Sequence, residues 1–528
     1  MKKKVLILML CSSLVGQGTM VSAADFSSES LTSVETTSEQ DQETVEEGSS
    51  EAQTDVQIEE DIEDAAEDTG TIEPEVSGAN ADLRAGSADD LEVSEFADGA
   101  FSATLAILET DRKVVDSGTE NNSEGQATIN WVLYDDGELV ISGTGAMRAY
   151  NPYGENDVPG FEKNFDITTS VVIEKGITTI GSGIFSRAKN LKKAILPDGL
   201  ESIGDFAFNE CRNLSTIRIP ESVTSIERCA FLACTSLIEI NIPDGITSLD
   251  SVFQDCSSLR SITVPDSVTN MEGAFNGCTN LKTANIPDGI KSLDTTFGGC
   301  SSLTNISIPD SVTNIETAFA DCSSLEEIIL PKNLTIIGRS AFYGCSSLKK
   351  INIPEKVTSI ESDAFGNCSS LQEINIPQNV TRIGGRIFRG CSSLTAISIP
   401  ESVTSLEDGF GEIGETFADC TNLVDITLPD TFNTIVDSMF RGCISLKNIN
   451  LPQSVTSIGK EAFKGCSSLE KIVIPSGVTQ IRSSAFENCN NLSKTVISEG
   501  VGSIDEKAFY GCALTAIDIP GSVKDIGP

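Results

Sequence analysis

Hydrophobic and polar residues follow a fixed order along most of this chain. In the stretch that ends at Pro354, the apolar residues Ile351 and Ile353 alternate with polar neighbours, as a strand with one buried face requires. Proline has no backbone N–H to donate, so the strand is predicted to end there. A second, shorter apolar run covers residues 357–360, and residues 363–365 are expected to begin a turn of helix on the opposite side.

The same order of residues recurs at a nearly constant interval. Successive cysteines are 22 or 23 residues apart, with a single step of 29, and phenylalanines keep the same spacing. The cysteines are Cys211, Cys234, Cys256, Cys278, Cys300, Cys322, Cys345, Cys368, Cys391, Cys420, Cys443, Cys466, Cys489 and Cys512. A period of 20 to 29 residues with one short apolar strand per unit predicts a leucine-rich repeat array. We therefore expect an α/β solenoid of about 15 units over residues 168–528.

Two irregularities interrupt this period. The four units between Cys234 and Cys322 have 22 residues each, having lost one residue before the phenylalanine, and their sequences match across two units, which indicates a 44-residue duplication. The long unit inserts a glycine- and glutamate-rich bulge from Glu407 to Glu415. The bulge breaks the regular stack and could frame a local binding site.

The first hundred residues carry a different pattern. Three lysines, an apolar run and Val21-Ser22-Ala23 predict a secretory signal peptide over residues 1–24, and hence an exported, secreted or cell-surface protein. Residues 25–99 are rich in Ser, Thr, Glu and Asp, so we expect a disordered acidic segment. It could act as a plain solvating spacer or as an acidic tail that captures a basic partner.

Residues 100–167 are expected to form an N-terminal cap region. Two alternating apolar runs flank Asp135-Asp136-Gly137, which predicts a β-hairpin that contains the only tryptophan, Trp131. The irregular stretch that follows concentrates four aromatic residues, which either seal the first repeat or bind a ligand. They are Tyr150, Tyr153, Phe161 and Phe165.

Composition excludes several function classes. A net charge of −42 argues against nucleic acid or an anionic membrane surface as a partner. The chain contains no histidine, which removes the commonest general base and every histidine-ligated metal site. No later stretch is apolar enough for a membrane span. We therefore expect no catalytic residues, no metal and no cofactor, although a glycosidase that uses two carboxylates needs no histidine.

Two columns of residues allow more than one interpretation. The cysteines could form disulfides or simply pack as small buried thiols; Ala188 at the equivalent position favours packing, with Cys229, which lies off the column, the likeliest exception. One carboxylate per 22-residue unit could bind calcium or cap the expected helical turn, and calcium needs six or more oxygens. These carboxylates are Asp250, Glu272, Asp294 and Glu316.

The repeat resembles that of the BspA-like leucine-rich repeat family of bacterial surface proteins. The shared pattern is Leu-x-x-Ile-x-Ile-Pro, then Val-Thr-x-Ile, then Ala-Phe-x-x-Cys, and it extends from about Thr168 to Pro528. The resemblance implies a secreted or surface-exposed protein that adheres to host or neighbouring-cell proteins. It indicates the fold specifically and does not identify a ligand.

If the repeats stack, the polar residues between the buried isoleucines form one exposed sheet face. This face is either a merely soluble strand surface or a binding surface for an extracellular protein or host-surface ligand. The richest run of hydrogen-bonding groups, which straddles the bulge, is Asn352, Glu373, Asn375, Asp425, Thr427, Asn448 and Asn450. We expect protein binding or adhesion there; a glycan-active enzyme and a structural surface-layer component are the alternatives.

Overall fold

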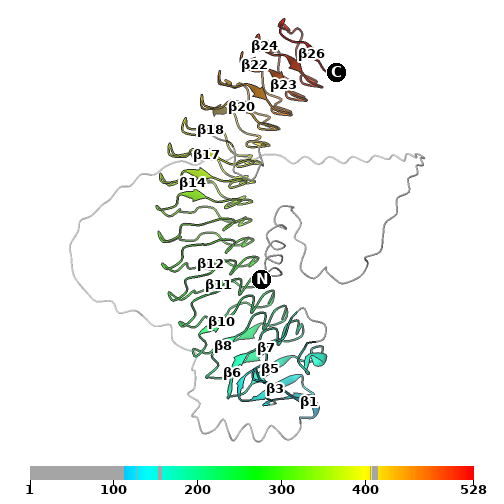
Figure 1. Ribbon diagram of the computed structural model, residues 1–528, viewed down its shortest axis with the longest axis vertical. Helices are drawn as coiled ribbons and strands as arrows, with labels where there is room; N and C mark the ends of the chain where they lie inside the picture. Colours follow the sequence, from blue (N-terminus) through cyan, green and yellow to red (C-terminus); the bar gives the residue numbers. More distant parts are fainter. Residues whose placement is uncertain (1–111, 127, 153–156, 405, 407–413) are drawn as a thin grey trace, which may run out of the picture. The chain divides into compact units, whose positions relative to one another are not determined.

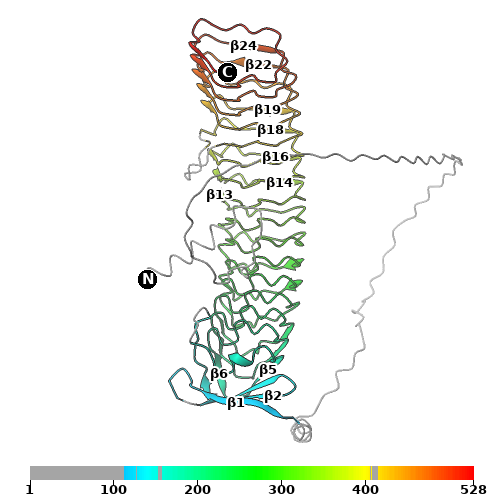
Figure 2. The same cartoon turned by 90° about the vertical axis from the view of Figure 1, so that its right-hand side faces the viewer.

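The computed structural model describes residues 112–126, 128–152, 157–404, 406 and 414–528. The expected signal peptide, the acidic segment 25–99, Tyr153 and residues 407–413 of the bulge lie outside these residues. In the described part, short turns of chain stack on one another, from the antiparallel strands near residue 112 to the last strand near the C-terminus (Figures 1 and 2).

The described chain begins with three antiparallel strands, β1 (Val114–Glu120), β2 (Ile129–Tyr134) and β3 (Glu138–Gly143). The hairpin predicted around Asp135-Asp136-Gly137 is confirmed, because β2 and β3 pair antiparallel and Gly137 takes a φ of +85° in the turn. Strand β1, which the sequence pattern did not predict, pairs with the other side of β2. Strand β3 then pairs in parallel with the first strand of the array, so the hairpin is continuous with the solenoid.

Each repeat contributes up to two short strands, which pair in parallel with those of neighbouring repeats. The first strands are β5 (Ser170–Ile173), β7 (Lys193–Ile195), β9 (Thr216–Ile217), β11 (Ser261–Ile262), β12 (Thr283–Ala284), β14 (Lys350–Asn352), β16 (Glu373–Asn375), β18 (Ala396–Ser398), β19 (Asp425–Thr427), β22 (Lys471–Ile474) and β24 (Lys494–Ile497). The second strands are β6 (Ile177–Ile180), β8 (Ser202–Ile203), β10 (Ser225–Ile226), β13 (Ile336–Ile337), β15 (Ser359–Ile360), β17 (Arg382–Ile383), β20 (Thr434–Ile435), β21 (Ser457–Ile458), β23 (Gln480–Ile481), β25 (Ser503–Ile504) and β26 (Asp525–Ile526), and β4 (Gly145–Ala146) extends their ladder.

The helical turn expected to begin at residues 363–365 and at the equivalent phenylalanines is absent from the described repeats, so the prediction of an α/β solenoid is wrong in this respect. The described residues contain one short 3-10 helix, η1 (Glu162–Asn164), and it precedes the array. In a typical repeat Ser340 and Gly344 have positive φ angles of 50° and 72°. The backbone N–H groups of Phe342 and Gly344 donate to the carbonyls of Ala364 and Gly366 in the next repeat. Since these bonds join repeats instead of running along the segment, the fold is a β-solenoid.

The phenylalanines form a continuous column through the core. From Phe185 to Phe509 adjacent rings stack with centroids 5.1 to 6.0 Å apart. Phe161 adds one ring to the N-terminal end of this column, and Trp131 meets Phe161 edge to face at 5.9 Å. Tyr150 and Phe165 are buried beside them. These described aromatic residues therefore seal the first repeat, which was one of their two predicted roles.

The cysteines form a second column, and each one satisfies a backbone carbonyl. From Cys211 to Cys512 every Sγ lies 3.1 to 3.2 Å from the carbonyl oxygen of a phenylalanine in the preceding repeat. The column cysteines are free thiols, and all except the half-buried Cys512 are buried. Burial raises the pKa of Cys391 and Cys443 to about 12, so the thiols stay protonated and can donate. Cys229, off the column, is buried as well.

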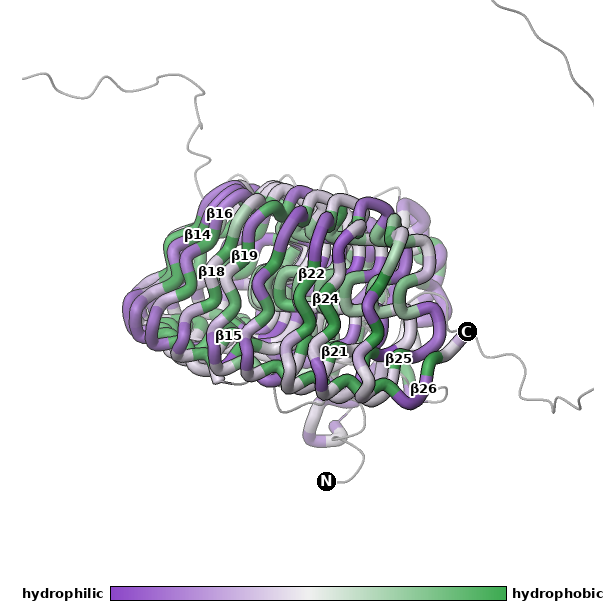
Figure 3. Tube along the Cα trace, turned by 90° about the horizontal axis from the view of Figure 1, so that it is seen from above, coloured by the Kyte–Doolittle hydropathy of each residue, from purple (hydrophilic) through white to green (hydrophobic). Residues whose placement is uncertain are grey.

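Viewed down the stack, residues of like hydropathy in successive repeats lie over one another (Figure 3).

The turn before each cysteine shows how closely the repeats pack. A side chain added at Gly344 would overlap Oδ1 of Asp321 in the preceding repeat, and Gly344 also has a positive φ. The same pairing of Asp or Asn with glycine recurs at Asp255 with Gly277, Asn367 with Gly390, Asp419 with Gly442, and Asn488 with Gly511.

The 22-residue repeats stack differently from the others. Their second strands are reduced to isolated bridges between Ser248 and Asn270 and, 44 residues later, between Ser292 and Asn314. In each pair the asparagine amide also donates to the serine hydroxyl. The predicted duplication is therefore visible as two paired repeats followed by two more.

Candidate binding face

The predicted binding residues lie on the exposed side of the first strands, which we call the first-strand face. Five of the seven occupy paired strands. In β14 and β16 the parallel register places Asn352 beside Asn375 and Lys350 beside Glu373. All of these side chains are exposed, and the isoleucine between each pair is buried.

The next two strands continue the same arrangement. Strand β18 pairs with β19, so that Ala396 lies beside Asp425 and Ser398 beside Thr427. Asn448 and Asn450 are also exposed, and they alternate with buried Ile449 and Leu451 as in a strand, although they lie outside any assigned strand. The structure thus gives all seven predicted residues equivalent outward positions in successive repeats.

Sequence reasoning missed a large apolar residue of this face, next to the predicted binding residues. Ile329 is 83% exposed, the highest value among the exposed large hydrophobic side chains described. Parallel bridges connect it to Ser307 on one side and to Asn352 on the other. Its position between two columns of buried aliphatic residues could have identified it, because the outward residues of the two adjacent repeats, Ser307 and Asn352, are polar. Ile329 adds an apolar contact point next to the predicted polar residues.

The bulge is described only at its end. Gly414 has a φ of +140°, and Glu415 pairs with Arg389 at 2.8 Å and with Arg441 at 3.2 Å. These arginines belong to the preceding and following repeats, so Glu415 ties the repeats together where the regular spacing is lost. Whether the bulge frames a binding site stays a prediction, since residues 407–413 lie outside the described part.

The column of carboxylates before the phenylalanines does not cap helices, because no helix follows them. Asp250 instead pairs with Arg228 at 3.5 Å. Burial, followed by the charges of Glu316 and Glu272, raises the pKa of Asp294 to about 6. In the described residues no group of three or more Cys, Asp and Glu side chains is arranged to hold a metal ion.

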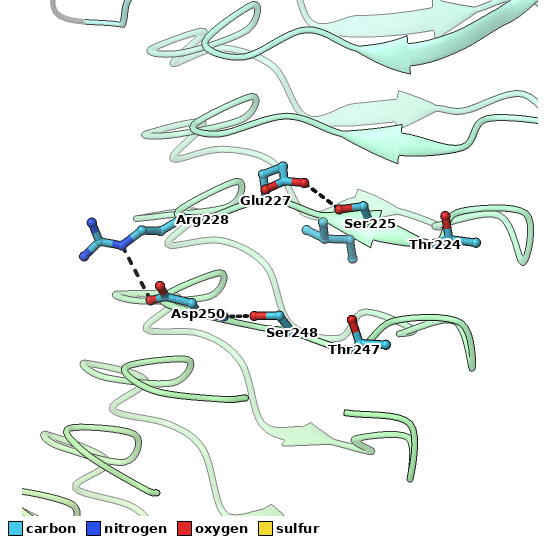
Figure 4. Close-up of a pocket in the computed structure, with 8 residues that line it drawn as sticks. Thr224, Ser225, Glu227, Arg228, Thr247, Ser248 and Asp250 are labelled. Carbon is cyan, nitrogen blue, oxygen red and sulfur yellow. Dashed lines mark hydrogen bonds and ion pairs between the residues drawn. The ribbon is translucent and has the colours of Figure 1, made fainter. Parts of the chain in front are cut away.

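A small polar cavity lies where the array changes from 23- to 22-residue repeats (Figure 4). Its volume is about 150 Å³, and it opens between β10 and the next repeat, to which β10 has no strand pairing. The side chains that line it already bond to one another: Ser225 donates to Glu227, and Arg228 pairs with Asp250. A space of this size holds a few water molecules and is too small for an extended ligand.

The geometry defines a class of protein, a leucine-rich repeat solenoid, and sequence comparison specifies the family. The BspA type leucine rich repeat region matches residues 161–273, 237–317, 292–410 and 412–528. This chain therefore belongs to the BspA-type leucine-rich repeat family, as the repeat pattern predicted. No curated protein matches the chain significantly.

Several solved structures are similar to this one. A leucine-rich repeat protein from Bacteroides ovatus is 28% identical, covers 59% of this chain and 83% of its own, and has a TM-score of 0.47. A leucine rich cell surface protein from Faecalibacterium prausnitzii is 26% identical, with coverage of 72% and 95% and a TM-score of 0.35. A leucine-rich repeat protein from Eubacterium ventriosum is 24% identical, with coverage of 78% and 93% and a TM-score of 0.36. No helix in the described residues is long and apolar enough to cross a membrane.

Proposed function

We propose that this protein is exported and that it binds another extracellular protein, as an adhesion or interaction module, through its first-strand face. The observation that carries the proposal is the parallel register of β14 with β16 and of β18 with β19. That register presents exposed amide, carboxylate and hydroxyl groups at the fixed spacing of a rigid core. Membership of the BspA-type family and the signal-peptide pattern at residues 1–24 support a location outside the cell.

A binding role fits the described chemistry better than a catalytic one. The core columns are buried and satisfied by one another, and the cavity of about 150 Å³ is lined by side chains such as Ser225 and Arg228 that already form hydrogen bonds or ion pairs with their neighbours. Asn352, Asn375 and Thr427 offer donors and acceptors that face solvent. Such a surface binds by many moderate polar contacts, with Ile329 as an apolar anchor, so the interaction should be salt-sensitive and modest in affinity.

To test the proposal, the purified chain is immobilised and its binding of candidate extracellular proteins and glycans is measured. Once a partner is found, its affinity is compared for the wild type and a variant with Glu373, Asn375, Asp425 and Thr427 changed to Ala. We expect at least a tenfold loss, about 1.4 kcal/mol, from four exposed polar contacts.

The matched control changes Glu355 and Gln378 to Ala, which are exposed in the turns just beyond the same strands. This variant should bind as the wild type does. Equal affinity of the wild type and the four-residue variant would place the site elsewhere.

A further inference from the structure

A second part of the first-strand face differs from the rest in charge. Strands β22 and β24 pair over four residues each, with Lys471 beside Lys494 and Val473 beside Val496. Both lysines are exposed, and the valines are 54% and 56% exposed. We call these four side chains the lysine–valine patch.

The arrangement of the lysines is not explained by folding. Like charges placed directly side by side in a sheet destabilise it, and neither Lys471 nor Lys494 forms an ion pair within the described chain. The protein has 78 acidic residues available, and at β14 and β16 it places Glu373 beside Lys350 in the equivalent position. The lysine pair therefore stands out in a chain whose net charge is −42.

The two valines indicate which side chains, besides charged ones, a partner of this patch must carry. In the equivalent outward positions of β14, β16 and β19 the chain has Asn352, Asn375 and Thr427, so Val473 and Val496 replace polar residues with apolar ones. An exposed aliphatic pair beside an unneutralised lysine pair suits an extended partner that carries carboxylate and aliphatic side chains two residues apart, because residues i and i+2 of an extended chain point to the same side. Glu470 precedes Lys471 and is exposed too, so it limits how many carboxylates the patch accepts.

We propose that the lysine–valine patch docks an extended acidic segment of a partner protein in which carboxylate and aliphatic residues stand two positions apart, so that both kinds of side chain face the patch. The long-range repulsion from this acidic chain does not prevent docking, because charges further away than about 8 Å are largely screened at physiological salt. The patch shares no residue with the seven predicted binding residues but lies on the same first-strand face, so the inference rests on the function proposed above and extends it; the peptide test is separate from the test of that function.

The test uses the full chain and a labelled eight-residue peptide in which glutamate and valine alternate at every second position and glutamine fills the positions between them, with binding followed by fluorescence polarisation. Changing Lys471 and Lys494 together to Gln should weaken binding about threefold to tenfold, because each exposed ion pair contributes modestly. Changing Val473 and Val496 together to Thr keeps the shape of the side chains and should weaken binding about threefold. The same peptide with glutamine in place of each glutamate should bind the wild type no better than the glutamate peptide binds the lysine variant.

Lys350→Gln on β14 is the matched control, since it removes a lysine from the same column that already has a carboxylate beside it. It should leave peptide binding unchanged. Thermal unfolding of the lysine variant should occur at an unchanged or higher midpoint, because a like-charge pair is removed.

Three results would overturn the inference. One is unchanged peptide binding by the lysine variant, and another is an equal loss in Lys350→Gln. The third is binding of dextran sulfate with the same dependence on the lysines while the valine variant is without effect, which would make the patch a simple site for polyanions.

Discussion

The 22-residue repeats and the 23-residue repeats hold their stacks by different means. In the 23-residue repeats the second strands form continuous ladders, as in β13, β15 and β17. In the 22-residue repeats one residue before the phenylalanine is missing. Their second strands are connected by a β-bridge only at every other junction between repeats, such as that of Ser248 with Asn270. Yet the phenylalanine rings stack through both regions, with Phe275 5.8 Å from Phe297 and Phe342 5.6 Å from Phe365. Where the second-strand pairing is interrupted, the core columns and the backbone bonds around the phenylalanines, such as that from the N–H of Phe275 to the carbonyl of Thr296, still hold the array in register.

Side chains replace some of the missing backbone bonds in the shorter repeats. The amide of Asn241 accepts from the N–H of Ile219 and donates to its carbonyl, and Asn285 does the same with Val264. An asparagine amide has one donor side and one acceptor side, so it can pair with a backbone as a neighbouring strand would. In the 23-residue repeats Asn375 occupies the same column, but its neighbours already pair through the backbone.

The largest effect is expected from the phenylalanine column. Phe275→Ala in the short repeats and Phe365→Ala in the long ones should each lower the free energy of unfolding by about 3–5 kcal/mol, because both rings are fully buried. Denaturant unfolding of the two variants measures this. If Phe275→Ala has much the smaller effect, the short repeats are loosely packed and the core does not unify the two regions.

The next effect concerns the glycine before the cysteine. Gly344→Ala should destabilise the protein by about 2 kcal/mol, since alanine is strained at a φ of 72° and its Cβ would overlap Asp321. Gly299→Ala, with a φ of 74° but only the backbone of Gly277 nearby at 3.4 Å, should have about half this effect. Thermal and denaturant midpoints provide the comparison. Adding Asp321→Gly to Gly344→Ala should recover the difference, beyond the gain that Asp321→Gly gives by itself at a φ of 57°. No further recovery would mean that the overlap with Asp321 does not cause the loss of stability.

A smaller effect on stability is expected to differ between Asn285 and Asn375, which occupy the same column. Asn285→Ala removes two hydrogen bonds to the backbone of Val264 and should lower the free energy of unfolding by about 1–2 kcal/mol. Asn375→Ala removes an exposed side chain from a paired strand, and its effect should stay within about 0.5 kcal/mol. Equal effects on denaturant midpoints would argue that the amide of Asn285 does not substitute for strand pairing.

The smallest effect is a pH dependence centred on Asp294 in the short repeats. Burial and the nearby Glu316 and Glu272 raise the pKa of Asp294 to about 6. A carboxyl whose folded pKa is raised stabilises the fold at low pH, and this contribution is lost as pH rises from about 4 through 6. Amide hydrogen exchange in residues 270–316 should therefore be slower at pH 5 than at pH 7.5, after correction for intrinsic rates. Asp294→Asn should remove the dependence, and its persistence would assign it to another group.

Most of the array could be predicted from the sequence, and the errors have a common origin. The spacing of Phe342, Cys345 and Ile351 identifies the repeat, its buried face and the place where each strand ends. The expected helical turn was wrong because residues such as Ser340 adopt positive φ angles, which the residue type alone does not reveal. For the binding face, the outward positions of Asn352 to Asn450 followed from alternation, but Ile329 was overlooked.

The sequence by itself determined the period, the core columns and the family, because a repeated pattern imposes the same burial on every unit. Only the tertiary structure decided which contacts the residues of each column make with the neighbouring repeats. The thiol of Cys345 donates to the carbonyl of Phe319, and Asp321 covers Gly344, and both contacts join residues more than 20 positions apart. Such contacts depend on how one repeat is placed on the next. The pairing of Lys471 with Lys494 belongs to the same category, because two lysines 23 residues apart become neighbours only when β22 and β24 lie side by side.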